Sequence, residues 1–294
     1  MLLREKIKQT HFSDAEQSII DLLLDQPEQI ANLTIQETAK LVYSHPSTFI
    51  RVAKKMGYSG WADFKSDYLD EYHYLNSKLS SIDSNLPFLA NDGLMTIANK
   101  IAHLEWDTIQ DTLSLLNHDT LQKAKQILVK ARQITIFTST TNAVIAEDFS
   151  LRMNRIGKQV SIVQTTGEHT YRASSCPADS CAILISYSGE NAAVLQTMQI
   201  LKKRKIPILA LTSIGDNTLS QGVDCVLSIT TRERLYSKIG SYVTTTSIVY
   251  LLNVLYSLIF SDAYQEHLSL LIQVGQLYDN RKGLPSILGE DDKE

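Results

Sequence analysis

The chain has 294 residues, 44% of them hydrophobic and 20% charged, which predicts an ordinary globular protein of about two domains. This composition excludes disorder as the main state, and a formal net charge of −4 excludes a globally basic nucleic-acid binder. Any contact with DNA must therefore come from a local patch of the surface.

Cysteine and histidine usage indicates neither a metal site nor a disulfide framework. The three cysteines stand at positions 176, 181 and 225, and the seven histidines have no ligand spacing. The N-terminal residues contain no apolar run long enough for a signal peptide. We therefore expect a cytoplasmic protein without a metal or other cofactor.

Two helix starts in the N-terminal third carry the capping-box signature, a Ser or Thr followed three residues later by Glu. These helices begin at Ser13 and Thr34. A third helix is expected over residues 46–56, because Pro46 suits the first turn of a helix and Gly57 suits the position after its end.

The second and third of these helices are joined by residues 43–45, a spacing typical of a helix-turn-helix. Polar side chains near the start of the third helix would reach base edges, and basic side chains a turn later would meet phosphates. The candidate DNA-binding residues are His45, Ser47, Thr48, Arg51, Lys54 and Lys55. A plain helical bundle with a polar face explains the spacing equally well, and residues 1–77 carry eight basic against eleven acidic residues, a net charge of −3.

The N-terminal segment resembles the RpiR-type helix-turn-helix of bacterial transcription regulators. The resemblance rests on the sequences FSDAE at 12–16, TIQETA at 34–39, PSTFIR at 46–51 and KKMGYSGWADFK at 54–65. It implies an all-α helix-turn-helix domain over residues 1–77 that binds a double-stranded DNA operator. His45 stands where the family usually has Ser, which is a better helix N-cap.

Residues 78–120 are expected to form a helical linker, with breakers at Pro87 and Gly93 and a helix over residues 94–116. From residue 121 onward, short apolar runs alternate with helical patterns. The expected strands are residues 134–137, 160–163, 181–185, 207–211 and 225–229, and the expected helices are residues 121–131, 142–156 and 192–205. Such alternation predicts an α/β domain, a parallel sheet with helices on both faces.

One loop of this sheet has the composition of a phosphate site. In open α/β sheets, ligands lie beyond the carboxyl ends of the strands, next to helix N-termini. Residues 186–191, SYSGEN, directly follow an expected strand and precede an expected helix. The hydroxyls of Ser186 and Ser188 can donate to a phosphate, and Gly189 allows close approach of the backbone. A serine-rich turn that only caps the helix explains the same residues.

The α/β part resembles the sugar isomerase (SIS) domain, which follows the RpiR-type helix-turn-helix in this family. The resemblance rests on ISYSGE at 185–190, ALT at 210–212 and residues 219–224. It implies a flavodoxin-like parallel-sheet domain over residues 121–265, followed by a C-terminal helix and tail over residues 266–294. The phosphosugar site that it implies comprises Ser186, Ser188, Gly189, Asn191, Thr138, Thr140 and Asn142.

The first strand–helix loop departs from the family pattern. Where the family has Gly-x-Gly-x-Ser, residues 138–142 read TSTTN and contain no glycine. Threonine resists a positive φ and keeps the backbone farther from a ligand, although its hydroxyl can replace a lost backbone contact. We expect a phosphosugar to bind with altered preference or with lower affinity than a glycine-bearing loop would give.

These patterns support three hypotheses about function. The first is a transcriptional regulator of carbohydrate metabolism whose SIS domain senses a phosphosugar and forms a homodimer or homotetramer. The second is a regulator whose SIS domain is only a dimerisation module. The third is a sugar-phosphate isomerase or lyase, with Glu168, His169, Glu190 and Glu233 as available bases, but no spacing marks one of them as catalytic. The attached helix-turn-helix favours a regulator over an enzyme.

The segment between Lys238 and Asp262 carries no charge and is long enough to span a bilayer. Its threonines, its tyrosines and Asn253 are costly in lipid, but a helix inside the protein or at a subunit interface accommodates them easily. We therefore expect a buried or interface helix and no membrane partner.

Overall fold

The structure is a computed structural model that describes residues 2–76 and 82–278. Its N-terminal part is helical. The helices are α1 (Leu3–Gln9), α2 (Asp14–Asp25), α3 (Pro27–Ala31), α4 (Ile35–Leu41), α5 (Pro46–Lys55) and α6 (Trp61–Asn76). The predicted starts at Ser13 and Thr34 are confirmed, since each residue is the N-cap of its helix and forms a capping box. Phe49, Trp61 and Phe64 fill the shared core of these helices.

Two further helices, α7 and α8, follow. α7 (Leu94–Ser114) confirms the predicted helix over residues 94–116. α8 (His118–Lys130) begins earlier than predicted, because the Asn117 side chain caps it by accepting from the backbone N–H of Thr120 at 2.9 Å. The predicted domain boundary between residues 77 and 78 lies outside the described residues, as do residues 279–294 of the predicted C-terminal segment.

The remainder of the chain is built on a parallel sheet. Its strands are β1 (Gln133–Phe137), β2 (Gln159–Val163), β3 (Ser180–Ser186), β4 (Ile208–Ser213) and β5 (Cys225–Ile229). Their order is β2-β1-β3-β4-β5, which is the flavodoxin-like order. The predicted fold class, a helical domain followed by a flavodoxin-like α/β domain, is confirmed.

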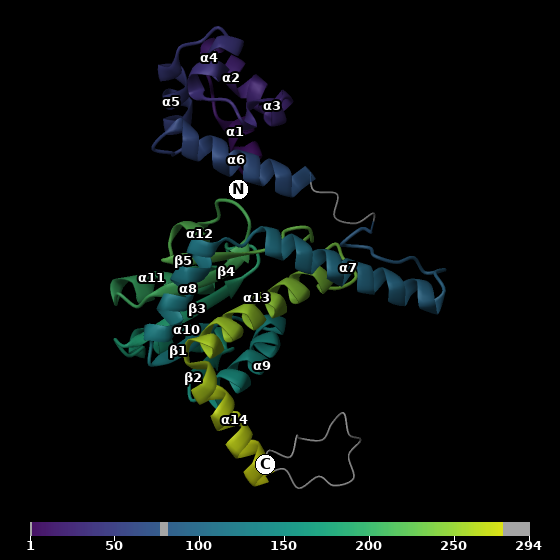
Figure 1. Cartoon of the computed structure of the whole chain (residues 1–294), viewed down its shortest axis with the longest axis vertical. Helices are drawn as coiled ribbons and strands as arrows, with labels where there is room; N and C mark the ends of the chain where they lie inside the picture. Colours follow the sequence, from purple (N-terminus) through teal and green to yellow (C-terminus); the bar gives the residue numbers. More distant parts are fainter. Residues whose placement is uncertain (1, 77–81, 279–294) are drawn as a thin grey trace.

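Helices cover both faces of the sheet (Figure 1). α8, α9 (Thr141–Arg155) and α13 (Tyr242–Phe260) pack on one face, while α10 (Thr166–Ser175) and α11 (Ala192–Lys203) pack on the other. β3 is buried along its whole length, as its continuous apolar sequence predicts. α10 was not predicted from the sequence; it is short and buries only His169 and Ala173.

The uncharged C-terminal segment forms α13. Ile248, Leu251 and Leu255 are fully buried in the core, and the helix packs against α7, α8 and α9. The prediction of a helix buried inside the protein is confirmed. The chain then continues through a 3₁₀ turn (Ser261–Ala263) into α14 (Tyr264–Tyr278), which extends away from the domain and has no buried residue (Figure 1).

Candidate functional site

The helix-turn-helix of the N-terminal domain consists of α4 and α5. α5 begins after His45, whose Nδ1 accepts from the backbone N–H of Ser47 at 3.3 Å. The histidine therefore supplies the N-cap that serine provides in the family, although the sequence predicted a poorer cap. At the other end, Gly57 adopts a φ of +94° and terminates the helix, as predicted.

α5 has a buried face and an exposed face. Phe49, Val52 and Ala53 have no exposed surface and fix the helix against the domain core. His45, Ser47, Arg51 and Lys54 lie on the exposed face. Thr48 differs from these candidates because it is only 6% exposed, and its hydroxyl accepts from Nη2 of Arg51 at 3.5 Å. Thr48 is thus placed to orient Arg51.

The exposed Lys55 is bound by the buried carboxylate of Glu16. Its Nζ donates to Oε2 of Glu16 at 2.5 Å, while Nε of Arg51 lies 3.9 Å from Oε1 of the same residue. The bond from Lys55 and a bond from the backbone N–H of Ser13 lower the pKa of Glu16 to about 2. Glu16 therefore joins the start of α2 to the end of α5, a role that its place in the capping box did not reveal.

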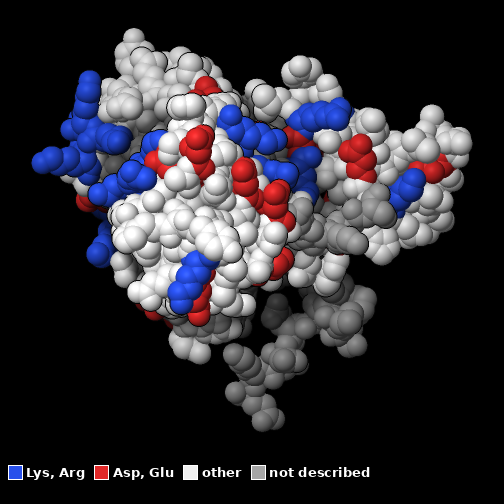
Figure 2. Space-filling model, turned by 90° about the horizontal axis from the view of Figure 1, so that it is seen from above, with Lys and Arg blue, Asp and Glu red and all other residues white. Residues whose placement is uncertain are grey.

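Charge is mixed over the end of the molecule that the helical domain occupies. In the view from above, several Lys and Arg side chains gather at the left edge, and elsewhere basic and acidic side chains are interspersed among uncharged ones (Figure 2). No broad positive field covers this face of the described residues, in keeping with the net charge of −3 in residues 1–77. An interaction with DNA must therefore depend on individual side chains around α5.

The second group of candidate residues meets at the carboxyl edge of the sheet. β1 and β3 are parallel neighbours, with Phe137 opposite Leu184. From β1 the chain adds β2 on one side, and it then adds β3, β4 and β5 on the other side, so the strand order reverses between β1 and β3. Ligands of such sheets bind in the crevice at this position. The Thr138 hydroxyl donates to the carbonyl of Ile185 at 3.1 Å, so the loops after β1 and β3 lie side by side.

The loop after β3 is closed by its own hydrogen bonds. The Ser188 hydroxyl accepts from the N–H of Glu190 at 3.2 Å, and the Asn191 side chain caps α11 by accepting from the N–H groups of residues 193 and 194. Gly189 has a φ of +68°, and a Cβ at this position would lie 2.0 Å from Oδ1 of Asn217. Ser186 is only 6% exposed.

The loop after β1 is strained and less bonded. Thr140 adopts a φ of +49° and a ψ of −126°, although the sequence predicted that threonine would resist such a conformation. A β-branched residue held there stores about 1–3 kcal/mol. The Thr140 side chain makes no capping bond to α9, so the first N–H groups of α9 stay without a side-chain cap. Thr138 is fully buried, Thr140 is exposed and Asn142 is partly exposed.

A network that was not predicted ties the loop after β3 to the helical domain. The Tyr187 hydroxyl donates to the carbonyl of Glu233 at 2.8 Å and accepts from its N–H at 3.1 Å. Burial raises the pKa of Tyr187 to about 12, so the phenol remains a donor at neutral pH. Tyr187 therefore links the candidate phosphosugar loop to residues 230–233, the segment after β5.

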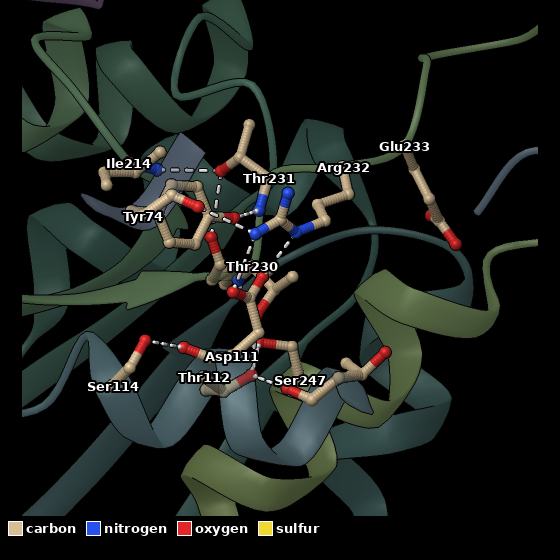
Figure 3. A network of polar contacts seen from close by, with 12 residues as sticks. Tyr74, Asp111, Thr112, Ser114, Ile214, Thr230, Thr231, Arg232, Glu233 and Ser247 are labelled. Carbon is tan, nitrogen blue, oxygen red and sulfur yellow. Dashed lines mark hydrogen bonds and ion pairs between the residues drawn. The ribbon is translucent and has the colours of Figure 1, made fainter. Parts of the chain in front are cut away.

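Residues 230–233 also bind α6, the last helix of the helical domain (Figure 3). Arg232 forms a bidentate ion pair with the buried Asp111 of α7, at 2.8 and 3.0 Å, and donates to the backbone carbonyl of Tyr74 in α6 at 2.9 Å. The N–H of Thr231 donates to the Tyr74 hydroxyl at 2.6 Å. We call Tyr74, Asp111, Thr231 and Arg232 the interdomain clamp.

Buried hydroxyls anchor the base of this clamp. The hydroxyls of Thr112 and Thr230 lie 2.8 Å apart, and Thr112 also donates to Ser247 of α13 at 2.9 Å. The Ser247 hydroxyl accepts from the N–H of Thr230 at 3.1 Å. Segment 230–233 is thereby fixed to both α7 and α13 (Figure 3).

Beside the clamp, the two domains enclose a cavity of about 790 Å³, with lining residues from α6, from the loop after β4 and from β5. Its lining includes the carboxylates of Asp67, Glu71 and Asp216, and burial raises the pKa values of Asp67 and Glu71. Nζ of Lys6 in α1 lies 3.5 Å from Oδ2 of Asp216 and forms an ion pair between the two domains. The domains are therefore joined by a few polar contacts around a hollow.

Comparison with known protein families agrees with this architecture. The model of the rpiR-family helix-turn-helix domain matches residues 1–73, and the model of the SIS domain matches residues 127–258. This chain is an RpiR-type transcriptional regulator with an SIS domain. The predicted family is confirmed.

Relatives of this RpiR-type regulator share its length and its helix-turn-helix. An HTH-type transcriptional regulator from Caldanaerobacter subterraneus subsp. tengcongensis is 22% identical over 92% of this chain and 94% of its own length. Another, from Haemophilus influenzae, is 27% identical over 72% of this chain and 74% of its own.

Solved structures show the same fold. The Vibrio vulnificus NanR protein complexed with ManNAc-6P is 20% identical, covers 95% of this chain and 98% of its own, and has a TM-score of 0.58. The sugar isomerase domain of an RpiR transcription factor from Sphaerobacter thermophilus is 16% identical, covers 61% of this chain and 98% of its own, and has a TM-score of 0.54. The second likeness corresponds to the SIS part alone.

Two of the four residues that the sequence offers as bases for an isomerase, Glu190 and Glu233, hold loops of the regulator. Glu233 accepts from the N–H of Val243, the hydroxyl of Thr244 and Nζ of Lys238 at 2.6–2.7 Å. Glu190 accepts from the N–H and the hydroxyl of Thr218 at 2.7 and 2.8 Å. General-base catalysis needs a carboxylate within reach of the substrate proton, so these bonds argue against either residue as a base.

Two further features bear on cofactors and membranes. Among the described residues, no group of three or more His, Cys, Asp or Glu side chains is arranged to hold a metal ion. The continuous helical segment Tyr242–Tyr278 is long and apolar enough to cross a membrane by length and composition, but its α13 part is a core helix of the SIS domain.

Proposed function

We propose that this RpiR-type regulator acts in the cytoplasm, binds a DNA operator through α5, and senses a phosphosugar through its SIS domain. We assign no catalysis to it. The proposed domains are residues 1–77 for DNA binding, 78–120 as a helical linker, 121–265 for sensing, and 266–294 as a C-terminal helix and tail.

The observation that carries the sensor hypothesis is the bonded route from Tyr187 to Tyr74. A phosphosugar that contacts Ser186 or Ser188 touches the residues on either side of Tyr187 in the chain. Tyr187 holds Glu233, and the adjacent Arg232 holds α6 of the helix-turn-helix domain. A pure dimerisation module has no need for such a route, so we favour a sensor over a dimerisation module.

The proposed phosphosugar site uses both loops of the β1/β3 crevice. The Ser186 and Ser188 hydroxyls and the uncapped N–H groups of α9 would donate to the phosphate, which the positive end of α9 also favours. Thr140 and Asn142 would contact the sugar from the rim, while Thr138, Gly189 and Asn191 would shape the loops. The ManNAc-6P complex of the Vibrio vulnificus NanR protein supports this class of ligand.

For the DNA contacts, Arg51 and Ser47 would meet base edges, with His45 beside them. Lys54 would meet a phosphate, Thr48 would orient Arg51, and Lys55 would hold the helix through Glu16. One recognition helix contacts too few base pairs for specific binding, so a homodimer or homotetramer would bind a palindromic operator. Exposed apolar side chains on α9 and α13 support a self-association surface, namely Val144, Leu151 and Val249.

The test begins with DNA duplexes that the protein itself selects from a random-sequence library. Titration calorimetry with a panel of hexose and amino-sugar phosphates identifies the tightest effector. Fluorescence anisotropy then measures operator affinity with and without that effector. We expect saturable effector binding and at least a fivefold change in operator affinity, the lower end of common allosteric coupling.

A coupled pair of variants separates sensing from mere binding. Tyr187→Phe removes the hydroxyl that holds Glu233, so it should keep effector affinity while reducing the effect of effector on operator binding. Tyr171→Phe, at an exposed tyrosine of α10, is the matched control. If no sugar phosphate binds, or if a bound one leaves operator affinity unchanged, the SIS domain is a dimerisation module.

A further inference from the structure

The turn between α4 and α5 contains a residue in an unfavourable backbone conformation. α4 ends in a Schellman motif, in which Ser44 N–H donates to the carbonyl of Ala39 at 3.0 Å and Tyr43 N–H donates to that of Lys40 at 3.4 Å. Tyr43 has a φ of +49° at the position after the helix cap. This position favours glycine, because a side chain there is strained.

Among the described residues, three other helices end in the same motif. α5 and α9 use Gly57 and Gly157 at the equivalent position, with φ values of +94° and +80°. α11 uses Lys205 at +59°, where a cation is favoured by the negative end of the helix. Tyrosine at position 43 is neither a glycine nor a cation, so neither explanation applies to it.

The Tyr43 side chain contributes nothing to packing. It is 100% exposed, and its hydroxyl makes no hydrogen bond within the part of the chain that the structure describes. Elsewhere in the helical domain, the large aromatic side chains Phe49, Trp61 and Phe64 are at most 5% exposed. A strained residue whose side chain lies wholly in solvent points to a binding role.

The surroundings of Tyr43 match a nucleic-acid backbone. The side chain lines a groove of about 540 Å³ together with Gln36, Lys40, Ser44 and Pro46. Gln36 and Lys40 are exposed donors, and the groove adjoins the start of α5. In a helix-turn-helix, the start of the second helix enters the major groove while the first helix crosses the DNA backbone, so the turn between them lies beside phosphates.

We propose that Tyr43 is a DNA-contacting residue whose phenolic hydroxyl donates to a backbone phosphate next to the half-site contacted by α5. The proposal rests on the proposed DNA-binding function. Tyrosine hydroxyls are among the side-chain donors that contact DNA phosphates, and such contacts set the register of the protein on the duplex. The contact accounts for a strained tyrosine at a position where the equivalent motifs after α5 and α9 have glycine.

The decisive variant is Tyr43→Gly, because it should have two effects of opposite sign. Glycine adopts a positive φ without strain, so the melting temperature of the helical domain should rise by roughly 4 °C. The lost hydrogen bond to a charged oxygen should weaken binding to the selected operator about tenfold. Lys205→Gly relieves the same conformation in the other domain and should leave operator affinity unchanged.

Tyr43→Phe removes only the hydroxyl. It should lose most of the operator affinity that Tyr43→Gly loses, while its melting temperature should equal that of the parent. Because the phenol is neutral, neither variant should change the salt dependence of binding, whereas Lys54→Ala should lower that slope by about one. Parent-like affinity of Tyr43→Gly would overturn the proposal, and parent-like affinity of Tyr43→Phe would overturn the phosphate contact. If the parent selects no DNA sequence, the proposed function fails first and this contact fails with it.

Discussion

The loops after β1 and β3 lie side by side at the same edge of the sheet, yet they satisfy their polar groups in different ways. In the loop after β3, Ser188, Glu190 and Asn191 each form hydrogen bonds within the loop or to a neighbouring helix. In the loop after β1, Thr140 is strained and leaves α9 without a side-chain cap. One loop is closed by its own bonds, and the other keeps open donors.

This difference adds the backbone N–H groups that follow β1 to the phosphate contacts that the sequence placed in the loop after β3. The sequence places the strongest phosphate signal at Ser186 and Ser188 and treats the glycine-free loop as weakened. In the structure, Ser186 is buried, whereas Thr140 takes the positive φ that glycine would take. Thr140 therefore adopts this conformation at a cost in conformational strain.

The largest effect is expected at Gly189 in the closed loop. Gly189→Ala introduces a Cβ at a φ of +68° and 2.0 Å from Oδ1 of Asn217, so it should destabilise the SIS domain by about 2–4 kcal/mol. Thermal unfolding measures the loss. Gly167→Ala, in α10 with open space around it, is the matched control and should be neutral. Equal behaviour of the two variants would show that the loop is not closed as described.

Ser188→Ala tests whether the closed loop contributes to the site. Loss of one hydrogen bond to a phosphate should lower the affinity for the tightest-binding sugar phosphate about tenfold, as measured by calorimetry. Asn142→Ala in the other loop should cost less, because the backbone N–H groups of α9 remain after truncation of the side chain. A larger loss from Asn142→Ala than from Ser188→Ala would contradict this division of roles.

Thr140→Gly should stabilise the SIS domain by about 1 kcal/mol, because relief of the strained conformation exceeds the entropy cost of a glycine. The expected rise in melting temperature is about 2–4 °C. Thr140→Ala keeps a Cβ at the same φ and should gain much less. A fall in stability with glycine would mean that the threonine side chain holds the loop.

The smallest effect concerns pH. The bonds from the N–H and the hydroxyl of Thr218 lower the pKa of Glu190 from its ordinary value of 4.5. A lowered pKa in the folded state contributes stability above pH 4.5, and this contribution is lost as the pH falls below that value. Glu190→Gln should remove this part of the pH dependence. The comparison of melting temperatures at pH 7 and pH 3.5 measures it, and an unchanged pH profile would count against the bond.

Local signals in the sequence were sufficient for much of the fold. The caps at Ser13 and Thr34 and the apolar strands at 181–185 and 225–229 predicted elements that the structure contains. Those signals act within a few residues, so their outcome does not depend on the rest of the chain.

Contacts between distant parts of the chain were beyond the reach of the sequence. Tyr187 and Glu233 are 46 residues apart, and Asp111 and Arg232 are 121 residues apart. Glu16 matched a capping box, but nothing in its neighbourhood indicated the bond to Lys55, 39 residues away. Such pairs are set by the packing of whole domains, as is the positive φ of Thr140.

The interdomain clamp joins two parts of one chain, and this affects how strong it has to be. Because α6 and α7 are connected covalently, re-formation of the clamp is an intramolecular event at an effective concentration on the order of millimolar. The bonds from Arg232 to Asp111 and Tyr74 therefore need less free energy to hold the two parts together than the same bonds between separate molecules would need. Under the proposed sensor function, a phosphosugar that binds the arrangement without the clamp more tightly would shift the population away from the clamped one by the difference in its two affinities.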